Sequence, residues 1–365
     1  MRVSGIPVRV RRAGLAVPVV ALTLACATLA LSAQSATPAQ PSSCAITTTD
    51  RVVAIGDVHG AYDRFVALLR QAALIDTRNH WSGGRAVLVQ TGDLVDRGAD
   101  SRKVLDLVMN LTAEAPKAGG TVVPLLGNHE VMRMMRDLRY VSAGEYAAFR
   151  APTSNDVRDR YYRDAVENAR ARARVIGQKF DEGPFRRQFQ EQFPVGYVEM
   201  QVAFGPDAPY GQWLRARDTV AKVNDVVFVH GGFTPEVAAL GCDAINNTVK
   251  SELRTRWSLD DSRLVSTLSA GPNGPLWYRG LSDESMEIPE SEVNTIRIAL
   301  RAATIVVGHT VAPELRIRTR YNGRVVQIDT GMLGGTFYPG GRASALEIKD
   351  DEFTVIADGK RQPLN

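Results

Sequence analysis

The sequence predicts an α/β protein whose core strands are largely parallel. Between residues 51 and 129, a short β-branched run, a glycine-containing polar loop and an amphipathic stretch follow one another repeatedly. This order is typical of βαβ units, in which the loops after the carboxyl ends of the strands gather in one crevice. A second group of β-rich runs follows residue 300, so we also expect strands late in the chain.

The first half carries the clearest periodicity. Apolar residues at helical spacing, among them Phe65, Leu68 and Leu69, predict a helix with one buried face. Ser101 is a residue type that can cap the next helix. The expected elements, in order, are a strand at 51–55, a helix at 62–74, a strand at 86–91, a helix at 101–114 and a strand at 121–126.

Residues 140–220 interrupt this order. The segment is rich in arginine, acidic residues, glutamine and aromatic residues, and it has no strand-like run until its end. We expect a mostly helical insertion. Its charges fit either a solvated helical face or a wall that faces a substrate.

Strands are expected again after the insertion, and we expect them to continue to the C-terminus. The expected elements are strands at 225–229 and 304–307, a helix from about Asp243, three β-rich runs at 315–320, 324–329 and 343–348, and a last strand at 352–356. The three β-rich runs suggest a closing antiparallel sheet.

The N-terminus has the order of a secretory signal peptide at residues 1–36. Four arginines precede an apolar stretch at 13–31, and small residues follow it. We therefore expect an exported protein, periplasmic or secreted, that contacts the membrane only through this segment; an uncleaved anchor and lipidation at Cys26 are the alternatives. A linker at 37–50, a folded domain at 51–358 and a tail at 359–365 complete the expected organisation.

Removal of this segment changes what charge and cysteines imply. The first 33 residues hold four arginines and no acid, which leaves 40 basic and 40 acidic residues in the rest of the chain. A balanced charge gives no support for nucleic-acid binding. Export would leave Cys44 and Cys242 in a compartment where disulfides persist. The sequence leaves open whether they form a bridge or are two small buried residues.

Five short motifs hold four of the five histidines. They are 56–60 (GDVHG), 92–98 (GDLVDRG), 127–130 (GNHE), 230–232 (HGG) and 308–310 (GHT). Two cations a few ångströms apart need a bridging carboxylate, further carboxylate and imidazole ligands, and open positions for water and a phosphoryl oxygen. Asp93 is the natural bridge, because its two oxygens can face one metal each. The candidate metal ligands are Asp57, His59, Asp93, Asn128, His230 and His309.

In this order the motifs resemble the catalytic core of the PPP-type metallophosphatases, within the calcineurin-like metallophosphoesterase superfamily. The surrounding residues, notably 213–215 (WLR), 229–232 (VHGG) and 275–279 (PLWYR), look like the Shewanella-like protein phosphatase branch. The resemblance implies a four-layer α/β/β/α sandwich, to which the helical insertion expected at 140–220 would add a cap or lobe. It covers most of the chain beyond the signal segment.

The resemblance also implies a role for each site residue. Asp57, His59 and Asp93 would hold one metal, and Asp93, Asn128, His230 and His309 the other. A hydroxide that bridges the metals would attack phosphorus, while Arg97, Asn128 and Arg279 bind the substrate. His129 would be the general acid, with Asp96 as its orienting partner. Mixed nitrogen and oxygen ligands suit manganese, iron and zinc alike.

The implied function is metal-dependent hydrolysis of phosphomonoesters. A phosphorylated protein, on serine, threonine or tyrosine, is the expected substrate, and a small phosphoester is the other possibility. The loop 330–335 (TGMLGG) departs from the aromatic-bearing loop of the eukaryotic serine/threonine enzymes, so a preference for phosphoserine does not carry over. The alternatives are a hydrolase of dinucleoside polyphosphates or other small diesters and anhydrides, and an exported metal-binding protein without catalysis.

Overall fold

The computed structural model of the chain describes residues 44–255 and 258–364. The expected signal peptide, Cys26 and residues 37–43 of the expected linker lie outside the described residues. Within the described part of the chain, no helix combines the length and the apolar character needed to cross a membrane.

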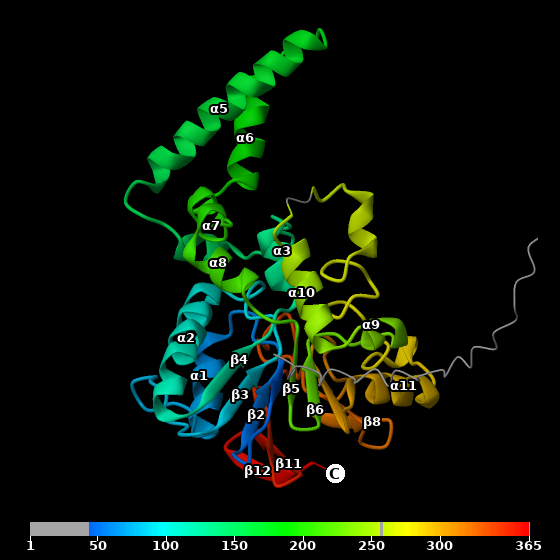
Figure 1. The fold of residues 1–365 in the computed structure, drawn as a ribbon. Coiled ribbons are helices and arrows are strands. Elements are labelled where there is room, and N and C mark those ends of the chain that lie inside the picture. The colour runs from blue at the N-terminus through cyan, green and yellow to red at the C-terminus, as the bar shows by residue number, and fades with distance from the viewer. Residues whose placement is uncertain (1–43, 256–257, 365) are drawn as a thin grey trace, which may run out of the picture. The chain divides into compact units, whose positions relative to one another are not determined.

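Two six-stranded sheets form the centre of the protein (Figure 1). One sheet has the order β12-β11-β10-β2-β3-β4, and the other has the order β1-β5-β6-β7-β9-β8. The strands are β1 (Ala45–Ile46), β2 (Val52–Ile55), β3 (Val87–Gln90), β4 (Thr121–Pro124), β5 (Val220–Val223), β6 (Val226–Val229), β7 (Thr304–Val307), β8 (Arg318–Arg320), β9 (Val325–Gln327), β10 (Ser344–Lys349), β11 (Glu352–Ala357) and β12 (Lys360–Pro363).

Each sheet contains three neighbouring parallel strands. β2, β3 and β4 run parallel in one sheet, and β6, β7 and β9 run parallel in the other. The loops that follow these strands therefore leave each sheet at one edge, as expected for parallel strands. The remaining strand pairs are antiparallel, except for the short parallel pair β1–β5.

Successive side chains of a strand point to opposite faces of its sheet, and the buried clusters show what packs on each face. In β2, Val52 and Ala54 belong to a buried cluster that also includes Phe228 of the other sheet, so this cluster lies between the sheets. Val53 and Ile55 point to the opposite face and pack with α1 and α2. Helices α9 and α11 cover the outer face of the other sheet in the same way. The expected α/β/β/α sandwich is thus confirmed.

Helices cover the sheets and fill the 140–220 segment. The helices are α1 (Tyr62–Gln71), α2 (Ser101–Glu114), α3 (Asn128–Met134), α4 (Ala143–Ala148), α5 (Ser154–Val175), α6 (Glu182–Gln192), α7 (Tyr197–Ala203), α8 (Pro209–Arg215), α9 (Pro235–Ala239), α10 (Cys242–Glu252) and α11 (Glu290–Leu300), with 3₁₀ turns at Ala115–Ala118, Ser262–Ser266 and Glu284–Met286. Helices α5 and α6 form a hairpin that extends away from the sheets (Figure 1).

The structure corrects four expectations. Residues 359–365 are not simply a tail, because β12 pairs with β11. The linker 37–50 contains β1, which pairs with β5, and β5 itself was not predicted. The late runs do not close one antiparallel sheet: β8 and β9 belong to one sheet, and β10 pairs with β2 in the other. Ser101 is the first residue of α2, after an N-cap at Asp100.

A disulfide joins Cys44 to Cys242, with 6.2 Å between their Cα atoms. It ties the residue before β1 to the start of α10, across 198 positions of sequence. Of the two alternatives left open by the sequence, the structure therefore has the bridge.

Candidate metal centre and active site

The five motifs meet at the carboxyl edges of the parallel strands. β2, β3 and β4 end one, two and three residues before the first three motifs, β6 ends immediately before His230, and β7 ends two residues before His309. The six candidate ligands are all buried, and the most exposed of them, His309, retains 8% of its accessible surface. Parallel topology thus gathers residues that are up to 252 positions apart in sequence.

One group of ligand atoms surrounds the Nε2 atom of His230. This atom lies 2.9 Å from Asn128 Oδ1, 3.1 Å from His309 Nδ1 and 3.4 Å from Asp93 Oδ2. The Nδ1 atom of the same ring donates to the carbonyl of Thr91 at 2.9 Å, which orients the ring. Asp93, His230 and His309 form a buried set with the spacing to hold a metal ion.

A second group surrounds the Nε2 atom of His59 on the other side of Asp93. This atom is 3.5 Å from Asp93 Oδ2 and 3.7 Å from Asp57 Oδ2. The Nδ1 atom of His59 donates to the carbonyl of Val95 at 2.9 Å, so Nε2 carries the lone pair. His129 also belongs to a set that could hold a metal, since its Nε2 lies 3.8 Å from Asp93 Oδ2. Asp93 is shared by both groups.

Backbone strain accompanies this convergence. His59, Asp93, Asp96, Arg97 and His309 all have positive φ between 47° and 71°, a region that non-glycine residues seldom adopt, although Asp and His enter it more often than most. Such strain persists only where the surrounding structure enforces it, and it clusters at functional sites.

Gly127 allows the third motif to approach the second. A Cβ atom at Gly127 would lie 2.2 Å from Asp93 Oδ1 and 2.4 Å from its backbone nitrogen, so no other residue fits without a shift. This close approach lets the backbone nitrogen of His129 donate to Asp93 Oδ1 at 3.0 Å. The backbone therefore engages Oδ1 of Asp93, and Oδ2 lies beside both groups of ligand atoms. The expectation that each oxygen faces a different metal position is thus corrected, although Asp93 is still shared by both groups.

The electrostatics of the site fit divalent cations. Burial raises the pKa of Asp57, and the nearby carboxylates Asp329 and Asp93 raise it further. Burial lowers the pKa of His230, but attraction by Asp93 and Asp57 outweighs it and brings the value to about 9. Burial lowers the pKa of His59 to about 3, so its neutral ring accepts a hydrogen bond from the Arg97 guanidinium. Asp93 and Asp57 thus stabilise positive charge at His230 on one side of Asp93, whereas burial keeps the ring of His59 on the other side neutral, as a metal ligand must be.

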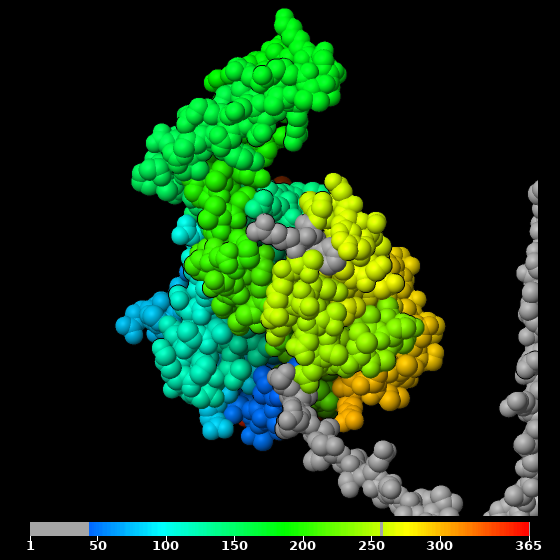
Figure 2. All heavy atoms as spheres, turned by 45° about the horizontal axis from the view of Figure 1, so that its top comes forward, coloured from blue at the N-terminus to red at the C-terminus, as the bar shows by residue number. Residues whose placement is uncertain are grey.

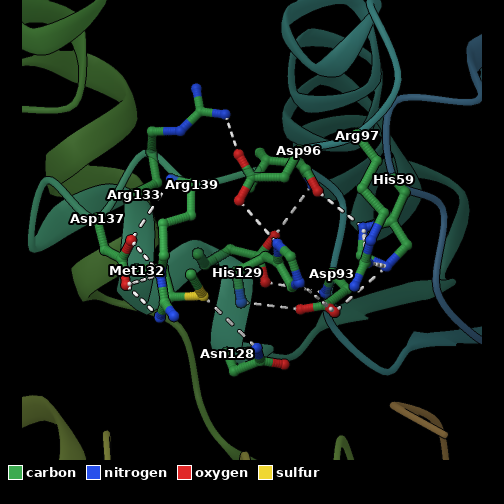
Figure 3. Close-up of polar contacts among 12 residues, drawn as sticks. His59, Asp93, Asp96, Arg97, Asn128, His129, Met132, Arg133, Asp137 and Arg139 are labelled. Carbon is green, nitrogen blue, oxygen red and sulfur yellow. Dashed lines mark hydrogen bonds and ion pairs between the residues drawn. The ribbon is translucent and has the colours of Figure 1, made fainter. Parts of the chain in front are cut away.

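A chain of buried ionic contacts lies beside the ligand atoms (Figure 3). His129 Nδ1 donates to Asp96 Oδ2 at 2.7 Å, and the other oxygen of Asp96 accepts from Arg133. Arg133 also donates to both oxygens of Glu145 at 2.9 Å. The Arg133 side chain is fully buried, as are the two carboxylates. Helix α4 of the inserted segment is thereby connected to the ring of His129.

Two arginines and two tyrosines border the ligand groups. The Arg97 guanidinium lies between the rings of Tyr140 and Tyr338, at 5.1 Å and 5.7 Å from their centres. Tyr140 also lies against His129, with 4.9 Å between ring centres. Arg279 donates to Thr310 Oγ1 at 2.9 Å, in the loop that carries His309. All predicted site residues therefore lie in one place, with Arg279 at its edge beside His309.

Sequence reasoning missed several residues of the site. Glu130 is fully buried and accepts from the backbone nitrogens of Gly127, Asp93 and Leu94, so it fixes one motif against another. It sits inside the GNHE motif, which could have singled it out. The other missed residues are Arg133, Glu145, Tyr140, Tyr338 and Asp329, and none of them stands in one of the five motifs.

Two sheets in an α/β/β/α sandwich, with buried histidine and aspartate groups at the strand ends, define a metallophosphoesterase. The chain belongs to the calcineurin-like phosphoesterase family, which matches residues 50–313. It is therefore a hydrolytic enzyme that acts on phosphoesters and has groups suited to metal ions.

Known proteins refine this assignment. The chain is 30% identical to Shewanella-like protein phosphatase 2 of Arabidopsis thaliana over 319 aligned residues. The alignment covers 83% of this chain and 76% of the relative. The structure of the cold-active protein-tyrosine phosphatase of a psychrophilic Shewanella species matches 88% of this chain and 82% of its own, with a TM-score of 0.65 and 28% identity. Similarity to the symmetrical bis(5'-nucleosyl)-tetraphosphatase of Cronobacter sakazakii, at 43% identity, is confined to 77 residues, or 21% of this chain.

Proposed function

We propose that this chain is an exported protein phosphatase that uses two divalent metal ions and hydrolyses phosphotyrosine in preference to phosphoserine. The observation that carries the proposal is the convergence of two groups of ligand atoms on Asp93, with His129 and Arg97 beside them. In this proposal one ion is held by Asp57, His59 and Asp93, and the other by Asp93, Asn128, His230 and His309. The ions would be manganese, iron or zinc.

The bound ions would supply Lewis-acid activation of the phosphoryl group and of the attacking water. The chain supplies the remaining functions. His129 is the proton donor to the leaving oxygen, because its Nδ1 is held by Asp96 and its Nε2 faces the ligand groups. Arg97 and Arg279 bind the phosphoryl oxygens, since planar guanidinium groups match them.

Aromatic side chains beside the phosphoryl position support a preference for phosphotyrosine. Tyr140 and Tyr338 flank Arg97 on two sides, and Tyr140 is 43% exposed, so its ring is accessible to a substrate. A phenyl ring can stack against such side chains, whereas the short serine side chain cannot reach them. The tyrosine-phosphatase activity named for the Shewanella relative agrees with this preference. The Cys44–Cys242 disulfide supports export to an oxidising compartment.

A panel of substrates tests the proposal. Purified exported protein, loaded with manganese, is assayed on phosphotyrosine and phosphoserine versions of one peptide, on an aryl phosphate and on a dinucleoside tetraphosphate. We expect turnover of the aryl phosphate and of the phosphotyrosine peptide, with a higher kcat/KM for phosphotyrosine than for phosphoserine. Preferred cleavage of the dinucleotide would contradict the proposal, as would metal binding without turnover of any substrate.

A further inference from the structure

The far end of the α5–α6 hairpin has a composition that differs from the rest of the insertion. We call residues 168–180 the hairpin tip. They contain three arginines and one lysine and no acidic residue, although acids are frequent on either side of them. Val175 and Ile176 are adjacent at the end of α5, where the chain turns toward α6.

The apolar pair at the tip faces solvent. Val175 is 87% exposed and Ile176 is 64% exposed, and Val175 is the most exposed large hydrophobic residue in the described part of the chain. Gly177 follows in a left-handed turn, and no atom lies within 4 Å of the position its Cβ would take. Figures 1 and 2 show this end of the hairpin standing clear of the sheets and their helices.

Folding of the hairpin does not explain the exposed pair, because aromatic residues closer to the body already join the two helices. Tyr161 packs on Phe189 and Phe193 at 5.6 Å and 5.2 Å between ring centres, and Tyr162 packs on Phe189 at 5.1 Å. Val175 and Ile176 lie at the far end of α5 and remain exposed there. An exposed apolar pair that the fold does not use is a candidate for insertion into another phase or partner.

Cations flank the apolar pair in the sequence. Arg170 pairs with Glu182 at 2.6 Å, whereas Arg172, Arg174 and Lys179 are exposed and have no ion pair with any described residue. Arg172 is two positions from Arg174, so the two point to opposite faces of the helix. Cations in the last turn of a helix also favour its dipole. The helix dipole does not explain the presence of Lys179, which lies beyond the end of α5, or of the exposed apolar pair.

We propose that the hairpin tip binds an anionic lipid surface, with Val175 and Ile176 among the headgroups and Arg172, Arg174 and Lys179 on the lipid phosphates. A convex tip suits a lipid surface, which deforms around it, whereas a protein partner would need a matching cavity. Each cation near an anionic membrane strengthens binding by about fivefold, and insertion of apolar side chains adds to it. This binding would bring the phosphatase to a membrane surface through the hairpin.

The test uses the exported protein and two kinds of vesicle, pure phosphatidylcholine and an equimolar mixture with phosphatidylglycerol. Hydrogen exchange of the peptide that covers the hairpin tip gives a local readout that an N-terminal apolar segment cannot imitate. We expect the mixed vesicles to slow exchange in this peptide, pure phosphatidylcholine to leave it unchanged and high salt to weaken the protection. Equal exchange with both vesicles would overturn the proposal.

Matched variants complete the test. Replacement of Arg172, Arg174 and Lys179 by Gln should weaken binding to mixed vesicles by about 10- to 100-fold. The control replaces three exposed cations away from the hairpin, Lys117, Arg316 and Lys360, by Gln and should bind as the parent does. Equal losses in both triple variants would reduce the effect to net charge and overturn the proposal.

A second pair of variants tests the apolar contribution. Val175→Ser with Ile176→Ser should lose about tenfold in vesicle binding, while Val265→Ser with Ile298→Ser, at other exposed apolar positions, should lose none. Every variant should hydrolyse aryl phosphate at the parental rate, so failure of membrane binding is distinguishable from failure of the proposed reaction. Equal protection of the tip by soluble poly-glutamate would assign it to acidic polypeptides and overturn the lipid proposal.

Discussion

Arg133 is expected to be the side chain whose loss most damages the support of His129. It is fully buried between Asp96 and Glu145, which are also fully buried. Burial lowers the pKa of Arg133, but the two carboxylates outweigh it and raise the value above its usual range, so the guanidinium stays charged. Arg133→Met keeps most of the volume and leaves two adjacent carboxylates without their cation. Breaking a buried ion pair in this way costs about 3–5 kcal/mol of stability.

Denaturation by guanidinium chloride, followed by tryptophan fluorescence, measures this loss. Adding Glu145→Met to Arg133→Met removes one of the stranded carboxylates, so the double variant should be more stable than the sum of the single effects predicts, by about 1–3 kcal/mol. The control is Arg85→Met, which breaks an ion pair with Asp50. The Arg85 side chain is 75% exposed, so this loss should cost about 1 kcal/mol of stability or less. A loss as small as this control's in Arg133→Met would refute the reasoning.

Three further predictions concern proton donation, phosphate binding and the disulfide. His129→Asn should slow hydrolysis of an alkyl phosphate by about 10²- to 10⁴-fold and hydrolysis of an activated aryl phosphate much less. Both metals should be retained. Equal losses on the two substrates, or loss of a metal, would instead indicate that His129 has a structural or metal-binding role. Arg279→Ala should lower kcat/KM by about 10- to 10³-fold without loss of metal. Arg279→Lys should not have the parental kcat/KM either. Unchanged turnover and unchanged inhibition by phosphate would exclude Arg279 from the site. Mass measurement under alkylation should find no free thiol at Cys44 or Cys242 before reduction, and Cys44→Ser should cost about 2–5 kcal/mol of stability; two free thiols would disprove the bridge.

The sequence predicts most of the fold because its strands are short and bounded by strong signals. β7 matches its predicted range, and β2, β3 and β4 lie within theirs. Two of the four edge strands, β1 and β12, escape prediction for a physical reason. β1 has two residues and β12 is wholly exposed, so neither carries the alternation of a half-buried strand, and both exist through pairing with a neighbour.

The site also contains residues that the sequence predicts and residues that it does not. Its ligand residues stand in short motifs beside glycines, and parallel topology brings them together. Arg133 and Glu145 carry no local signal, because their role depends on contacts with Asp96 across 37 and 49 positions of sequence. The tyrosines on either side of Arg97 also come from distant loops, so only the folded chain shows that they meet.

Metal content measured together with turnover tests the central claim most directly, because Asp93 alone faces both groups of ligand atoms. Elemental analysis of the parent protein should find two metal ions per chain. Asp93→Asn should lose metal from both positions together with activity, whereas His59→Asn should weaken mainly one position. An Asp93→Asn protein that keeps two full metal ions and its turnover would contradict the account.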